Sequence, residues 1–140
     1  MKFRRILPLF LSVWLFTAAT AFAENMQFVD AVGATGYYVD VDSLSFSQTT
    51  EVQPDKTKKN YEIVQARVAV IKARTNRRYI YLMQFNKEKM LYRILSSKVQ
   101  IYDSKQFVEQ TDEVSPELPF VASSPMQTVL DFIYEQPRNK

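Results

Sequence analysis

Basic side chains gather in the middle of the chain, where they could bind an anion or an acidic partner. Between Lys56 and Lys98, twelve lysines and arginines stand against two acids, Glu62 and Glu88. The candidate binding residues surround one expected hairpin or precede it, and they are Arg67, Lys72, Arg74, Arg77, Arg78, Lys56, Lys58 and Lys59. The alternative is that these charges lie on solvated strand edges and turns, where they only deter edge-to-edge pairing.

A second group of polar residues follows the pattern Y-x-D-x-x-S, with Tyr38, Asp40 and Ser43 at its three named positions. Asp40 and Asp42 leave the same side of an expected strand, which could suggest a cation site. Two carboxylates provide too few oxygen ligands for a cation by themselves. We therefore expect no metal here, and we expect Asp40 or Asp42 to accept hydrogen bonds from backbone amides where the strand turns.

The residue types that are missing exclude most familiar active sites. The chain has no cysteine and no histidine, which excludes a thiol nucleophile, a thiolate metal site and a Ser-His-Asp triad. Gly33 and Gly36 are its only glycines, so a glycine-rich phosphate loop is not expected. The sequence predicts a non-enzymatic protein without a cofactor. The remaining catalytic alternative is a hydrolase that uses two carboxylates.

The first 23 residues have the order of a bacterial secretory signal. Lys2, Arg4 and Arg5 precede the apolar run 6–16, and residues 21–23 (AFA) supply a cleavage pattern. The run is shorter than a membrane span, so we expect cleavage after Ala23 and no stable membrane anchor. The mature chain would be one domain, residues 24–140, with 15 basic and 15 acidic residues, in the periplasm or outside the cell. Export and zero net charge argue against a nucleic-acid partner.

The mature region predicts a run of antiparallel strands, because its connections are too short for parallel crossovers. The expected strands are 26–32, 37–41, 61–74, 78–86, 89–95 and 98–103, with a long exposed loop over 47–60 and an extended surface segment over 110–124. Asn76 lies in a tight connection, where it can adopt the left-handed conformation. Alternate residues Tyr79, Tyr81, Met83 and Phe85 form a stripe on one sheet face. That stripe is either covered by a helix or lines a ligand groove.

One helix is expected near the end of the chain. Ser124 is a suitable N-cap, Pro125 occupies the first helical position and Pro137 ends the pattern. The apolar stripe of the helix is formed by Met126, Val129, Leu130 and Ile133. An isolated helix of this length is marginal in water, so it must dock on the sheet. The predicted fold is therefore α+β, with about six antiparallel strands packed by one C-terminal helix after a signal peptide.

Four segments resemble the surface-adhesin protein E-like family of small bacterial envelope proteins. They are YYVDVDSLSF (residues 37–46), the paired strands QARVAVIKAR and RYIYLMQF, and SPELPFVASSPMQTVLDFIYE (residues 115–135). The resemblance implies a six-stranded antiparallel sheet with a C-terminal helix. It also implies binding of host matrix proteins or plasminogen.

These observations together predict a small exported binding domain whose partner is a host or envelope protein. Two alternatives stay open: a periplasmic partner in envelope assembly, and the carboxylate-dependent hydrolase. The sequence leaves the oligomeric state open.

Overall fold

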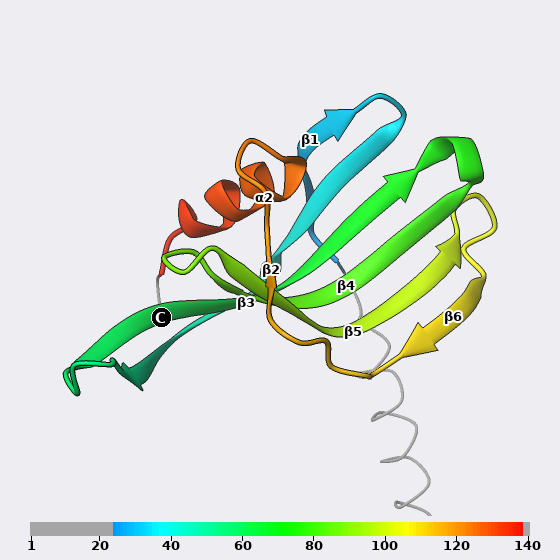
Figure 1. The fold of residues 1–140 in the computed structure, drawn as a ribbon. Coiled ribbons are helices and arrows are strands. Elements are labelled where there is room, and N and C mark those ends of the chain that lie inside the picture. Colours follow the sequence, from blue (N-terminus) through cyan, green and yellow to red (C-terminus); the bar gives the residue numbers. More distant parts are fainter. Residues whose placement is uncertain (1–23, 139–140) are drawn as a thin grey trace, which may run out of the picture.

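The computed structural model of the protein describes residues 24–138. It is a twisted antiparallel sheet with one helix packed against one face (Figure 1). The elements are β1 (Met26–Val32), β2 (Thr35–Val52), β3 (Lys58–Lys72), a short 3-10 turn η1 (Ala73–Thr75), β4 (Arg77–Asn86), β5 (Leu91–Ile101), β6 (Phe107–Thr111), β7 (Leu118–Pro119) and α2 (Pro125–Tyr134). The strand order is β1-β2-β3-β4-β5-β6, and β7 pairs with β5. The predicted antiparallel sheet with one helix near the C-terminus is confirmed. The predicted signal peptide, residues 1–23, lies outside the described residues.

The first hairpin forms where the sequence predicted it. β1 and β2 are joined at Gly33 and Ala34, and Gly33 has a φ of +58°, a conformation that glycine adopts without steric cost. The ring of Tyr38 lies over Gly36, where an added Cβ would approach Tyr38 Cε1 to 3.0 Å. The aromatic side chain therefore packs directly on the backbone of its own strand.

The predicted exposed loop over residues 47–60 is wrong. Residues 47–52 of β2 pair with residues 58–63 of β3, and the two strands project from the sheet as a two-stranded arm (Figure 1). Residues 47–52 and 58–60 of the arm contain no buried side chain, so their sequence needs no alternation of apolar and polar residues. A hydrogen bond of 2.6 Å between Thr50 Oγ1 and Asn60 Oδ1 links the strands, and Lys89 Nζ reaches Glu51 Oε1 at 3.0 Å.

The second half of the sheet also differs from the prediction. A single strand, β5, replaces the two expected strands over 89–95 and 98–103, because a β-bulge opposite Leu82 and Met83 keeps the pairing continuous. The strand β6 was not predicted: it begins at Phe107 and includes only the first two residues of the expected extended segment over 110–124. It pairs along β5 and is exposed at every residue. Such a strand has no buried face and leaves little hydrophobic pattern in the sequence.

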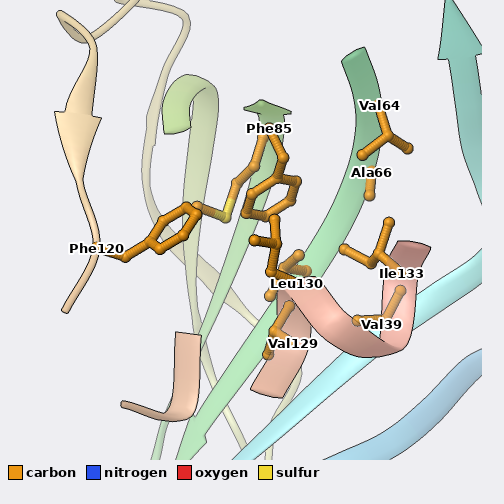
Figure 2. Close-up of a cluster of buried hydrophobic side chains, with 10 residues drawn as sticks. Val39, Val64, Ala66, Phe85, Phe120, Val129, Leu130 and Ile133 are labelled. Atoms are coloured by element: carbon orange, nitrogen blue, oxygen red, sulfur yellow. The ribbon is translucent and has the colours of Figure 1, made fainter. Parts of the chain in front are cut away.

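The core lies between α2 and one face of the sheet, as predicted. Val129, Leu130 and Ile133 are fully buried, and Figure 2 shows them directed at side chains of β2, β3 and β4. The sheet side of this core comprises Val39, Val64, Ala66, Val68, Met83 and Phe85, and Phe120 closes it from the segment before the helix. Ser124 caps the helix, because its Oγ accepts the Gln127 N–H at 3.3 Å.

The helix covers only part of the predicted aromatic stripe. Met83 and Phe85 are buried beneath it, whereas Tyr79 and Tyr81 lie farther along β4 and are half-buried. Within residues 24–138, no helix has the length and apolar character that crossing a membrane requires.

Candidate functional site

The structure separates the predicted basic residues along the length of β3. Lys56, Lys58 and Lys59 lie at or near the tip of the arm, and Lys72 ends the same strand. A strand of 15 residues is roughly 50 Å long at about 3.3 Å per residue. The predicted cluster is therefore two groups at opposite ends of β3, with Arg67 between them.

Three of the predicted basic residues are engaged in ion pairs within the fold. Arg67 Nη1 lies 3.2 Å from Asp40 Oδ2, and Arg78 Nη2 lies 2.8 Å from Glu24 Oε1. Lys59 pairs with Glu88, and this hydrogen bond raises the pKa of the lysine. These charges are largely neutralised by their partners and contribute little to a free basic surface.

Three other predicted residues form a group that we call the turn-end cluster: Lys72, Arg74 and Arg77. None of them has a carboxylate oxygen within 4 Å among the described residues. Arg77 Nη1 donates to the carbonyls of Thr75 and Asn76, both at 3.3 Å, so its charge is held beside the turn. The cluster is a small basic surface without an ion pair among the described residues, and the nearby β5–β6 connection carries one acid, Asp103.

Three connections of the sheet meet at this end and hold the cluster in place. The Ala73 N–H donates to the Ala34 carbonyl at 3.1 Å, which joins the β3–β4 connection to the β1–β2 turn. Asn76 has the predicted left-handed backbone, with a φ of 55°. Its carbonyl accepts the Tyr102 N–H at 3.0 Å and its side-chain Oδ1 accepts the Asp103 N–H at 3.1 Å.

The β5–β6 connection brings a further base, Lys105, to this end of the sheet. Lys105 Nζ donates to the Tyr102 carbonyl at 3.1 Å and lies 4.6 Å from the centre of that ring. Lys105 was not among the predicted residues, because it follows Arg77 by 28 residues and only the pairing of β4 with β5 brings the two connections together.

Aromatic rings extend the turn-end cluster along β4. Lys72 Nζ lies 5.3 Å from the centre of the Tyr79 ring, which stacks on Tyr81 with centroids 6.4 Å apart and an interplanar angle of 11°. Burial raises the pKa of Tyr81, and the neighbouring Tyr79 adds to this shift. The Tyr81 phenol is therefore neutral at physiological pH, and the surface combines cations with flat aromatic rings.

Two residues of the predicted Tyr38, Asp40 and Ser43 motif, Asp40 and Ser43, organise a β-bulge in β2. Asp40 is buried, and its Oδ1 accepts the N–H groups of Asn25 at 3.2 Å and Asp42 at 3.1 Å. Ser43 Oγ donates to the Asp40 carbonyl at 2.7 Å and accepts the N–H of Arg67 in β3 at 2.8 Å. These bonds satisfy backbone groups where the register shifts between Asp40 and Ser45.

The expected hydrogen bonding of Asp40 to backbone amides is confirmed. Tyr38 takes no part in the bulge and packs edge-on against Phe28, with ring centroids 5.6 Å apart. In the part of the chain that the structure describes, no group of three or more acidic side chains is placed to hold a metal ion.

A cleft of about 570 Å³, which was not predicted from the sequence, lies beside the bulge. Residues 41–48 of β2 form one wall, and residues 136–138, just after α2, form the other. The wall of β2 falls partly within the segment that was predicted as a loop, which is why no sequence pattern indicated a cleft. Its dimensions suit a small molecule or several residues of a peptide.

An arginine beyond the helix closes one end of this cleft. Arg138 Nε and Nη2 donate to Glu62 Oε2 and Oε1 at 3.0 and 2.9 Å, and the guanidinium carbon lies 4.3 Å from the centre of the Phe46 ring. The hydrogen bonds from Arg138 lower the pKa of Glu62. Glu62 is therefore ionised and occupied, which makes it unsuited to donating a proton as a general acid.

Comparison of the chain with protein-family models, with curated proteins and with solved structures finds no match.

Proposed function

We propose that this protein is an exported, non-enzymatic binding domain, and that its turn-end cluster recognises an acidic surface of a host or envelope protein. The observation that carries the proposal is the contrast between its basic residues. Arg67, Arg78 and Lys59 are paired with acids, whereas the other five predicted bases have no carboxylate within 4 Å among the described residues. Of these five, Lys56 and Lys58 lie at the arm, and Lys72, Arg74 and Arg77 lie together at the end of the sheet that carries the stacked rings of Tyr79 and Tyr81. Exposed cations held by hydrogen-bonded turns form a surface to which an acidic partner is attracted.

The aromatic rings beside the cluster support a protein partner. Tyrosine supplies large contact area at low cost in conformational entropy and is enriched in protein–protein interfaces. Tyr79 and Tyr81 are stacked on each other and only half-buried, so they offer rigid apolar surface next to the charges. The resemblance of residues 37–46 and 115–135 to surface-adhesin protein E-like proteins is consistent with a binding role.

A non-enzymatic role is supported by the state of the carboxylates in the cleft. Glu62 is held by two hydrogen bonds from Arg138. Asp42, the other carboxylate of the cleft, is exposed to solvent. A two-carboxylate hydrolase needs one acid whose environment raises its pKa, whereas the pKa of Glu62 is lowered.

Charge reversal tests the binding surface. The variant Arg74→Glu/Arg77→Glu changes the cluster, and Lys56→Glu/Lys58→Glu makes the same change in net charge at the arm tip. With a fluorescein-labelled polyglutamate peptide as the probe, fluorescence anisotropy at low salt should show at least about a tenfold loss of affinity for the first variant only. An equal loss in both variants would show that net charge alone accounts for the attraction and would contradict the proposed site. No loss in either variant would also contradict the proposal.

Export is tested separately in cells. We expect the protein in the osmotic-shock fraction or the medium, with an intact mass that begins at Glu24. A mature mass that begins at Met1 would contradict the export proposal without affecting the binding test.

A further inference from the structure

We infer that the cleft beside the β-bulge is a docking groove for an extended peptide segment of a partner protein, which would add to the free edge of β2 as a new strand. The first observation is the pairing of β2. Its neighbour β1 pairs with it only from Thr35 to Asp40, and the register of β1 begins at Met26↔Asp40. From Ser45 to Val52, β2 pairs with β3 on one side, and no described strand pairs with its other side. An unpaired edge presents alternating N–H and C=O groups that can hydrogen-bond to an added strand.

The segment before β1, Glu24 and Asn25, turns away from the free edge of β2 instead of pairing along it. A strand running backwards from Met26 would lie beside residues 41–48, because β1 and β2 are antiparallel. Instead, the carbonyl of Asn25 accepts the Val41 N–H at 3.1 Å, and the Asn25 N–H turns to the buried carboxylate of Asp40. Glu24 then reaches Arg78 on β4, two strands away. These contacts direct the chain away and leave the line of β1 open to another strand.

The cleft supplies room for the side chains of the added strand. It lies along the same stretch of β2, and the residues that shape it are Leu44, Phe46, Gln48, Gln136, Pro137 and Arg138. Leu44 and Phe46 are partly buried against the core, so their remaining surface offers apolar contact. The groove therefore provides both parts of strand addition: backbone groups for affinity and pockets for alternate side chains.

The charges of the groove indicate the chemistry of the occupant. Glu62 and Arg138 neutralise each other. Asp42 is exposed, and no described lysine or arginine lies within 4 Å of its carboxylate. The favoured occupant is an extended segment of alternating apolar and polar residues with a basic side chain facing Asp42. Edge-to-edge docking of a second copy is disfavoured, because its outer strands β1 and β6 carry the acids Asp30 and Glu109 and no basic residue that could pair with Asp42.

A synthetic probe tests the groove in the purified protein. The probe is a peptide of about ten residues that alternates valine with lysine and threonine. Hydrogen exchange measured by mass spectrometry should show slower exchange in segments covering residues 42–48 when the peptide is added, and no change in β6. Slowing at the turn-end cluster or at β6 without any at residues 42–48 would overturn the inference.

Backbone pairing is distinguished from side-chain contact by N-methylated forms of the peptide. Methylation of every second amide removes the donors of one edge and keeps all side chains. When the methylated amides are those that face β2, binding should weaken at least about tenfold; when they are the alternate amides, which face away from β2, binding should be nearly unchanged. Unchanged binding of both methylated peptides would exclude strand addition.

The predicted charge preference is tested by Asp42→Lys, with Asp112→Lys as a matched control because Asp112 is also exposed and lies beyond β6. Asp42→Lys should weaken peptide binding at least about fivefold, and the control should not. Equal effects would contradict the assigned position of the basic side chain.

The same exchange measurement without peptide identifies the two competing occupants. Protection of residues 42–48 that grows with protein concentration would assign the groove to a second copy. At low concentration, in a monomer, protection of the amides of residues 42–48 that do not bond to β3 would assign it to another part of the same chain. Either result would overturn the inference of a partner peptide.

Discussion

Arg138 and Glu62 are 76 residues apart in the chain and form a two-point ion pair that ties the segment after α2 to β3. The remaining guanidinium nitrogen of Arg138, Nη1, donates to the carbonyls of Tyr134 at 2.6 Å and Gln136 at 2.7 Å. One side chain therefore bonds to carbonyls at and beyond the C-terminal end of the helix and fixes its position against the sheet. The same pair forms an end of the cleft, so the stability of the helix and the shape of the groove depend on one interaction.

Breaking this pair should lower stability modestly. Both side chains are about one-third exposed, and water screens their attraction, so Glu62→Gln is expected to cost about 0.5–1 kcal/mol. The pKa of Glu62 is lowered in the folded state, so this stabilisation is complete above the unfolded pKa of about 4.3 and is lost as the pH falls through the lower folded pKa. Urea unfolding of wild type and variant should show a difference at pH 7 that disappears in acid. A difference that grows in acid would contradict the assignment.

Replacing Asp40 should cost more than replacing its exposed neighbour. Asp40→Ala removes the acceptor of two backbone N–H groups and of Arg67, so we expect a loss of about 1–3 kcal/mol in the free energy of unfolding. Asp42→Ala is the matched control and should change stability by less than about 0.5 kcal/mol. Chemical denaturation measures both, and equal effects would show that the bulge does not depend on Asp40.

Truncating the helix core should be strongly destabilising. Leu130 is fully buried between α2 and the sheet, so Leu130→Ala should cost about 2–5 kcal/mol through lost burial and the cavity that it leaves. Val121→Ala is the control, because Val121 is 74% exposed. Thermal unfolding followed by circular dichroism should separate the two variants clearly. Similar melting temperatures would contradict the observed docking of the helix.

The left-handed position of Asn76 gives a prediction with a characteristic order. Asn76→Gly and Asn76→Ala both lose the side-chain bond to Asp103, but the glycine variant also removes the Cβ from the left-handed region, whereas the alanine variant keeps it. The alanine variant should therefore be less stable than the glycine variant by about 1 kcal/mol. Urea unfolding measures the order. A more stable alanine variant would indicate that the turn changes conformation.

Tyr134 should be detectable as a phenol that ionises at a higher pH than an exposed tyrosine, because its pKa is raised. Its hydroxyl donates to the Glu62 carbonyl at 2.9 Å and accepts the Lys87 N–H at 3.3 Å. Burial, the largest cause, raises its pKa, so its contribution to stability is complete below the unfolded pKa of about 10 and is lost as the pH rises through the folded pKa. Tyr134→Phe should remove one late step from an ultraviolet titration and cost about 1 kcal/mol at neutral pH. An unchanged titration would contradict this assignment.

The local elements were largely predictable because nearby residues determine them. Ser124 and Pro125 specify where α2 begins, and the spacing of Val129, Leu130 and Ile133 specifies the face that it buries. Asn76 was predicted in its left-handed conformation because few residues other than glycine tolerate it. Each of these properties depends on steric and hydrogen-bonding preferences that act over a few residues.

The lengths of the strands were not predictable where a strand has no buried face. Residues 47–52 are polar and close to Pro54, which is typical of a loop, yet cross-strand partners in β3 hold them extended. β6 has the same property, since all of its residues are exposed. Alternation of apolar and polar residues is typical of a strand with one buried face, and neither residues 47–52 nor β6 contain a buried residue.

For the candidate sites, the residue types were predictable from the sequence, but their contacts were not. The sequence by itself determined which side chains are available: a chain without cysteine or histidine, rich in bases between Lys56 and Lys98. Only the tertiary structure decided which of those bases are neutralised, because Asp40 and Glu24 reach Arg67 and Arg78 across the sheet. The cleft and its free edge likewise depend on contacts between residues far apart in the chain. Such contacts are selected by packing and register, and single-sequence patterns carry no record of them.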